Sequence, residues 1–213
     1  MKSMVSSIFS KEYIDENTKI LLDCDDTIIN SSKCIIDLLN KKNSSNKTID
    51  DLSDFYYRSI DPNISSNDII KLFESDEFWN SVQYNFDFLI YKEFINNNFD
   101  VEIVSCGTKL NLEKKKKYIK DVGYKFTGIL MNDNTSLCKS CVNMQGGIQI
   151  DDNIRSIENT NAAIKILLKN EHDFPWNNPK PNIDNLYVVQ NWKEIYQILE
   201  FFNKNPEFVC KEY

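Results

Sequence analysis

The sequence Ile20-Leu21-Leu22-Asp23-Cys24-Asp25-Asp26-Thr27 joins a short apolar run directly to a group of acidic residues. Two acids at positions i and i+2 of an extended chain lie on the same side of it. Open parallel sheets bind their ligands at the carboxyl ends of the strands. Asp23 and Asp25 are therefore placed for chemistry in which one carboxylate attacks and the other moves a proton. The alternative is an acidic turn that closes a strand, and three further segments argue against it.

A second strand is predicted over residues 101–104, with Ser105 at its end and Gly107 in the turn that follows. Glycine permits a tight turn that exposes backbone N–H groups. A hydroxyl group beside backbone donors suits a phosphoryl oxygen. Ser105 is therefore a candidate phosphate ligand.

A third strand is predicted over residues 148–150, and it ends in Asp151 and Asp152. Adjacent carboxylates at such a position favour a divalent cation, which prefers oxygen ligands. Lys139 lies twelve residues before Asp151. Its ammonium group is a candidate partner for the same phosphate.

The whole chain alternates predicted strands with predicted helices. The strands are expected at 20–22, 101–104, 128–131, 148–150 and 186–189. The helices are expected at 31–39, 67–73, 86–95, 111–120, 157–168 and 193–202. This alternation predicts an α/β fold, a Rossmann-like parallel sheet with helices on both faces.

The motifs follow one another in a defined order: Asp-x-Asp-x-Thr, a Ser at a strand end, a Lys, and a strand that ends in Asp-Asp. In this order of motifs the chain resembles the haloacid dehalogenase superfamily of aspartate-dependent phosphatases. Within it, the chain is most similar to the 5'(3')-deoxyribonucleotidases and their bacterial and phage relatives. The segments that carry this narrower resemblance are 105–112, 146–153, 173–177, 186–189 and 191–195. Cys24 departs from the aliphatic residue or Met that relatives usually have there, although a small apolar thiol should fit.

The resemblance implies a Mg²⁺-dependent mechanism. Asp23 would attack phosphorus to give an aspartyl-phosphate, and Asp25 would act first as acid and then as base. Mg²⁺ would be bound by Asp23, the backbone carbonyl of Asp25, Asp152, and Asp151 directly or through water. The implied phosphate-binding residues are Ser105, Cys106, Lys139 and Thr27, the last by fixing the loop.

The resemblance also divides the chain into a core phosphatase domain, 1–30 and 98–213, and a small, mainly helical cap inserted after the first strand, 31–97. Aromatic residues crowd this insertion. Phe78 and Trp79 are expected to line the pocket and contact the substrate, because an aromatic wall suits a flat base. The alternative is that they form the core of the insertion.

Composition limits the possible partners. The 213 residues carry 25 basic and 32 acidic side chains, a formal charge of −7. This argues against binding to duplex nucleic acid, whose phosphates must be neutralised. No apolar run approaches the roughly 20 residues of a membrane span, and no secretory core is visible near the N-terminus. We expect a soluble, cytoplasmic protein, a monomer or homodimer, with no membrane partner.

The six cysteines are scattered, which favours a reducing compartment over a disulfide framework. Cys138 and Cys141 form a single CxxC. One such pair is a poor zinc signal, because a structural zinc needs four ligands and the chain has one histidine. We expect both thiols to be reduced and metal-free.

Three functions remain open. The first is a Mg²⁺-dependent 5'(3')-deoxyribonucleotidase that acts on nucleoside monophosphates. The second is the same chemistry on another small phosphorylated metabolite, such as a sugar phosphate. The third is a non-catalytic binding protein on the same fold, which the retention of Asp23, Asp25, Lys139 and the Asp151-Asp152 pair disfavours.

Overall fold

The computed structural model describes residues 19–131, 139–172, 174–179 and 183–205. Its centre is a six-stranded sheet in the order β3-β2-β1-β4-β5-β6, and every neighbouring pair is parallel. This confirms the predicted fold class. The strands are β1 (Lys19–Leu22), β2 (Asp100–Gly107), β3 (Lys125–Leu130), β4 (Ile148–Asp151), β5 (Ile164–Leu168) and β6 (Leu186–Val189).

All the α-helices except α1 begin at a residue whose side chain caps the first turn. Ser65 accepts a hydrogen bond from Asp68 N at the start of α2, and Asn191 accepts one from Glu194 N at the start of α7. The α-helices are α1 (Ser31–Asn43), α2 (Ser66–Glu74), α3 (Asp76–Ser81), α4 (Phe86–Asn98), α5 (Lys109–Tyr118), α6 (Ile154–Ile157) and α7 (Trp192–Lys204). Short 3₁₀ turns are η1 (Ile49–Asp51), η2 (Ile119–Val122) and η3 (Pro175–Asn177).

The sheet is covered on both faces. Ile20 of β1 belongs to the main core with Phe88 of α4 and Trp192 of α7. Leu21 points to the opposite face, and Leu167 of β5 packs there against α6. Side chains alternate across a strand, so each strand contributes to both layers. None of the helices within the described ranges has the length and apolar composition needed to cross a bilayer.

The prediction of a helix over 157–168 is wrong. The structure has the short helix α6, a connection, and then β5, whose five residues are all buried. A strand in the middle of a parallel sheet is apolar on both faces, so its sequence does not alternate. Such a run cannot be told from a buried helix by periodicity alone. The run Ile164-Lys165-Ile166-Leu167-Leu168 is of this kind.

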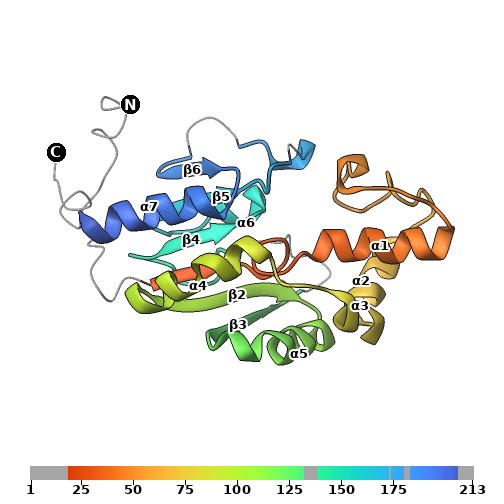
Figure 1. Ribbon diagram of the computed structural model, residues 1–213, viewed down its shortest axis with the longest axis horizontal. Coiled ribbons are helices and arrows are strands. Elements are labelled where there is room, and N and C mark those ends of the chain that lie inside the picture. The colour runs from red at the N-terminus through yellow and green to blue at the C-terminus, as the bar shows by residue number, and fades with distance from the viewer. Residues whose placement is uncertain (1–18, 132–138, 173, 180–182, 206–213) are drawn as a thin grey trace.

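The segment between β1 and β2 leaves the core and returns to it at adjacent points. Asn30 N donates to Gln83 O over 2.9 Å, and Asn85 N donates to Ile28 O over 2.7 Å. Figure 1 shows α1, α2 and α3 gathered at one end of the molecule, beyond the carboxyl ends of the strands. After the second linker, α4 packs against α7 and β2. The division into a core and a cap stays a prediction.

The position of β5 inside the sheet makes a prediction about stability. Replacing the fully buried Ile166 with Ala should lower the free energy of unfolding by about 2–5 kcal/mol, because it removes buried methylene groups and leaves a cavity. On the neighbouring strand Val188 is 43% exposed, so Val188→Ala should cost no more than about 1 kcal/mol. Urea denaturation of both variants measures the difference. Equal costs would contradict a central position for β5.

Candidate active site

Asp23 directly follows β1 and stays beside β4, because its backbone N–H donates to Ile150 O over 2.9 Å. The chain then turns sharply. Ile28 N and Ile29 N both donate to the carbonyl oxygen of Cys24, at 3.0 and 3.1 Å. Residues 25–27 thus form a tight loop between Cys24 and its first donor. The side chains of residues 23–29, which we name the nucleophile loop after the role expected of Asp23, are held at the end of the sheet.

The nucleophile loop is also anchored from three directions. Asn170 Nδ2 donates to Asp26 O over 2.5 Å, and Trp192 Nε1 donates to Thr27 O over 3.1 Å. The Asp26 carboxylate accepts hydrogen bonds from Ser32 N, at 2.8 Å, and from Ser32 Oγ. Asp26 therefore satisfies a free donor in the first turn of α1, because the side chain of the N-cap Asn30 makes no capping bond there. Its φ of 49° is the left-handed conformation that this sharp turn requires.

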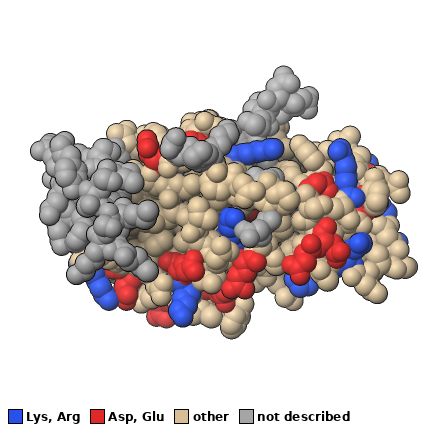
Figure 2. Space-filling model, turned by 90° about the horizontal axis from the view of Figure 1, so that it is seen from above, with Lys and Arg blue, Asp and Glu red and all other residues tan. Residues whose placement is uncertain are grey.

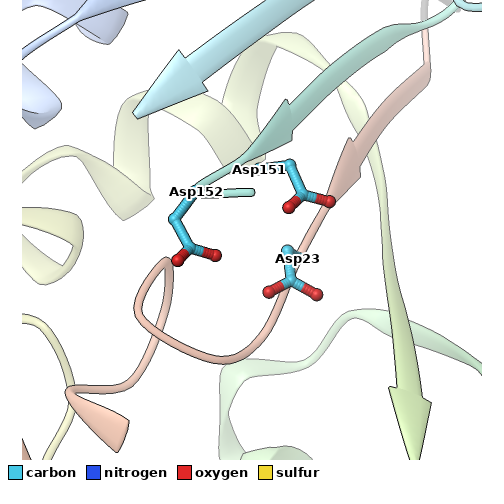
Figure 3. A group of neighbouring side chains, drawn as sticks. All are labelled: Asp23, Asp151 and Asp152. Atoms are coloured by element: carbon cyan, nitrogen blue, oxygen red, sulfur yellow. The ribbon is translucent and has the colours of Figure 1, made fainter. Parts of the chain in front are cut away.

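Three carboxylates meet where β1 and β4 end. Figure 3 shows Asp23, Asp151 and Asp152 directed toward a common point, and their ligand oxygens lie within 4.8 Å of one another. Asp151 is held in place by Asn153 N, which donates to its Oδ1 over 2.9 Å. Asn177 Nδ2 donates to the backbone oxygen of Asp152.

Lys139 lies against this cluster. Its Nζ donates to Asp23 Oδ1 over 2.5 Å and to Asp151 Oδ2 over 2.6 Å, and the residue is 3% exposed. Burial acts to lower the pKa of Lys139, but the two carboxylates outweigh it and raise the pKa above its usual range. The side chain is therefore a fixed cation beside Asp23, in the place that the sequence predicted.

The acidic cluster fits a divalent cation. Three carboxylates and one ammonium group leave a formal charge of −2. Burial, followed by repulsion from Asp26, Asp23 and Asp151, raises the pKa of Asp152 well above its usual range. The donors are all oxygens, the ligand type that Mg²⁺ binds. A cation would relieve the repulsion, so Asp23, Asp151 and Asp152 are suitable ligands.

Lys115 is a site residue that the sequence did not single out. It lies on α5 in a run of four lysines, and it is 1% exposed. Its Nζ donates to Asp25 Oδ2, to Ser105 Oγ over 2.8 Å and to Cys106 O over 3.2 Å. Lys115 therefore joins the two strand ends at β1 and β2.

Burial is the largest influence on the pKa values of Asp25, Asp26 and Asp151. It raises the pKa of Asp26 to about 6, against the hydrogen bonds from Ser32 that lower it. Burial also raises the pKa of Asp25, although Lys115 opposes the shift. The pKa of Asp151 is raised to about 6 by burial, despite Lys139. These carboxyl groups therefore keep their protons to a higher pH than exposed carboxyl groups do.

A cavity of about 340 Å³ opens over these groups. Its walls include Asp23, Asp25, Ser105, Cys106, Lys115, Lys139, Asp151 and Asp152. Part of the lining is an aromatic wall, and most of its residues come from the segment between β1 and β2. The aromatic residues are Phe55, Tyr56, Tyr57, Phe73 and, from the core, Phe174.

Phe78 and Trp79 are not in this wall, and the expectation that they contact the substrate needs correction. Phe78 is fully buried between the rings of Phe73 and Trp79, with centroids 5.0 Å away in both cases. Trp79 Nε1 donates to Phe73 O over 2.7 Å. Both side chains form the core of the insertion, the alternative that the sequence left open.

Other predicted residues are placed as follows. Thr27 is fully buried, does not line the cavity, and its Oγ1 has no hydrogen-bond partner among the described residues. Cys106 lines the cavity, and burial raises the pKa of its thiol to about 11.

Gly107 ends β2, where the side chain of Asn111 comes close to the backbone. A Cβ at this position would collide with Asn111 Oδ1, so the contact favours glycine. Cys138 lies outside the described residues, so the expectation that Cys138 and Cys141 are reduced and metal-free stays a prediction.

Surface charge is mixed on the face seen in Figure 2. Lys and Arg side chains stand among acidic ones there rather than merging into a continuous basic area, and acidic side chains gather along the lower edge of that view. Three lysines among the described residues are buried, and two of them, Lys115 and Lys139, line the cavity. Buried positive charge is therefore present inside the site.

Solved structures share this arrangement of strands and helices. A hydrolase of the haloacid dehalogenase-like family from Streptococcus pneumoniae matches with a TM-score of 0.55 at 13% identity, over 87% of this chain and 100% of that chain. A candidate haloacid dehalogenase hydrolase from Bacillus subtilis, YfnB, was solved bound to magnesium. It gives a TM-score of 0.53 at 14% identity, over 87% and 99% of the two chains.

The chain has the fold of the haloacid dehalogenase-like hydrolases. A further neighbour with this fold is a candidate phosphoglycolate phosphatase from Lactobacillus plantarum. It has a TM-score of 0.50 at 11% identity, and the match covers 85% of this chain and 99% of that chain. No protein-family model and no curated protein matches the chain.

The acidic cluster makes a prediction about metal binding. Mg²⁺ should raise the melting temperature of the wild-type protein, because it binds the folded state alone. Asp152→Asn should abolish that rise, and its own metal-free melting temperature should be at least that of the wild type, because repulsion between carboxylates is reduced. Differential scanning calorimetry with and without Mg²⁺ measures both effects.

Asp37→Asn is the control for this experiment. Asp37 is exposed and pairs with Lys33 on the surface of α1. The control should keep the full Mg²⁺-dependent rise. An unchanged rise in Asp152→Asn would show that the ion, if bound, is held elsewhere.

Proposed function

We propose that the protein hydrolyses phosphomonoesters through an aspartyl-phosphate on Asp23, with Mg²⁺ as its cofactor. One observation carries the proposal: Asp23 lines a cavity together with two groups of charged residues. The first group is Lys139, Asp151 and Asp152, which lie beside Asp23, and the second is the ion pair of Asp25 and Lys115. A nucleophile, an acid and fixed cations thus share one small space.

The chemistry takes place in two steps. A carboxylate oxygen of Asp23 forms a bond to phosphorus while the bond from phosphorus to the ester oxygen breaks, and Asp25 gives its proton to that departing oxygen. Water then attacks phosphorus, Asp25 takes the proton from it, and the bond to Asp23 breaks. Inorganic phosphate leaves, and both aspartates return to their starting state.

Charge stabilisation is divided among the remaining groups. A bound Mg²⁺ supplies the neutralisation that lets a carboxylate approach a phosphate dianion. Lys139 and Ser105 would hold the oxygens of the transferred group as charge develops. The anchors of the nucleophile loop on Asn170 and Trp192 would keep Asp23 aligned for attack.

The aromatic wall supports a nucleoside monophosphate as substrate. Phe55, Tyr56 and Phe73 line the same cavity as the acids, so a flat base could stack there while its phosphate lies at Asp23. The 5'(3')-deoxyribonucleotidase assignment rests on this wall and on the sequence resemblance. The segment that carries the wall would then act as the cap.

The second candidate is a phosphatase of a small phosphorylated metabolite, such as a sugar phosphate or a phosphorylated acid. Arg155 is exposed and lines the same cavity, and a guanidinium group pairs well with a carboxylate. The neighbour from Lactobacillus plantarum is named for phosphoglycolate, which carries both a phosphate and a carboxylate. A panel of nucleoside monophosphates, sugar phosphates and phosphoglycolate, assayed for phosphate release with and without Mg²⁺, distinguishes the two.

The first prediction concerns the nucleophile. Asp23→Asn should reduce phosphatase turnover by at least about 10⁴-fold while the fold is kept, because the amide has nearly the same volume but does not attack phosphorus. Steady-state release of phosphate, with circular dichroism as the check on folding, measures this. Activity within about tenfold of the wild type would be incompatible with a covalent mechanism.

The second prediction concerns the aromatic wall. Tyr56 is 45% exposed and lines the cavity, so Tyr56→Ala should cost about 1–3 kcal/mol in kcat/KM for a nucleoside monophosphate by loss of stacking. The same variant should change kcat/KM for glycerol phosphate much less, because that substrate has no ring. Phe86→Ala, at a side chain that is 72% exposed and outside the cavity wall, is the control. Equal losses on both substrates would remove the physical support for a nucleotide.

A further inference from the structure

The run Lys114-Lys115-Lys116-Lys117 on α5 presents one lysine inward. Lys116 and Lys117 are exposed, and Lys114 pairs with Asp76 over 2.6 Å. Lys115 is buried, and its Nζ lies 5.9 Å from the centroid of the Phe73 ring. A buried ammonium group is costly unless it is fully hydrogen-bonded, so the contacts of Lys115 indicate what it does.

All three N–H groups of the Lys115 ammonium have acceptors. They are Asp25 Oδ2, Ser105 Oγ at 2.8 Å and Cys106 O at 3.2 Å. An ammonium group has three donors and no acceptor. In this arrangement no donor remains for a phosphoryl oxygen, so Lys115 is poorly suited to clamp the transferred group.

Lys139 has different partners. It bonds Asp23 and Asp151, which are the proposed nucleophile and a proposed metal ligand. The two buried lysines are thus divided between the two acids of the nucleophile loop. Lys139 contacts the acid that attacks, and Lys115 contacts the acid that moves the proton.

We propose that Lys115 is a positioning residue for the departure of the leaving group, acting through Asp25. It holds the Asp25 carboxyl group beside Ser105, so that the proton passes from Asp25 to the ester oxygen as the bond from phosphorus to that oxygen breaks. Lys115 itself gains and loses no proton. The inference rests on the proposed phosphatase function and adds a division of labour between the two lysines.

Leaving groups of different basicity separate this role from phosphate binding. An alkoxide needs a proton as it departs, whereas dinitrophenolate does not. Lys115→Met should therefore lower kcat for an alkyl phosphate by about 100-fold or more, within the range for loss of general acid catalysis. It should lower the first-turnover burst rate with 2,4-dinitrophenyl phosphate by less than about fivefold, at an unchanged KM. Equal losses on both substrates would overturn the proposal.

Lys116→Met is the matched control. It makes the same chemical change one residue along the helix, at an exposed side chain. It should leave both rates within about twofold of the wild type. A wild-type protein that releases phosphate from none of the esters would refute the phosphatase function itself, which is a separate outcome from a Lys115 variant that fails the leaving-group test.

A second test compares Asp25→Asn with the double variant Asp25→Asn, Lys115→Met, and it can be done even if Lys115→Met alone does not fold. The double variant has lost both charges of the buried ion pair, so neither charge is left without its partner. If Lys115 acts through Asp25, adding Lys115→Met to Asp25→Asn should change the dinitrophenolate burst rate by less than about threefold, because the effects of coupled residues are not additive. A further loss of about 100-fold would show that Lys115 contacts the transferred group directly.

Discussion

The crowding of like charge at the ends of β1 and β4 is the constraint on which the site depends. Five carboxylates line one cavity, those of Asp23, Asp25, Asp26, Asp151 and Asp152. The buried ammonium groups that face them within the described chain are those of Lys115 and Lys139. Such an arrangement persists only where the backbone fixes each acid, and the anchored nucleophile loop does this. The remaining negative charge is what makes the site suitable for a divalent cation.

The sequence predicts the acid-bearing part of the fold well, because one local pattern identifies it. An apolar run that ends in acids marks both the strand and its carboxyl end, so β1 and β4 could be placed with Asp23, Asp151 and Asp152. The same logic fails for β5. Its residues are buried on both faces, and a five-residue run that is apolar apart from Lys165 is too short for its period to separate a strand from a helix.

Two errors about individual side chains have a common cause. Lys115 looks like its neighbours in a polar run, and only the rotation of α5 relative to the sheet decides which lysine points inward. Phe78 is expected from the sequence to line the pocket, yet it is fully buried. Orientation is set by tertiary packing, which composition does not encode. A signal was available for Lys115: it lies ten residues after Ser105 on the helix that follows the same strand.

The paired linkers on either side of the insertion have a consequence for the history of such a chain. Ile29 and Tyr84 form an antiparallel bridge, so the segment between them begins and ends at neighbouring points. The entropy of closing a loop grows slowly with its length. Residues can therefore be gained, lost or exchanged inside the segment without altering the span that its ends must bridge. The aromatic wall can diverge over generations while the nucleophile loop is inherited unchanged.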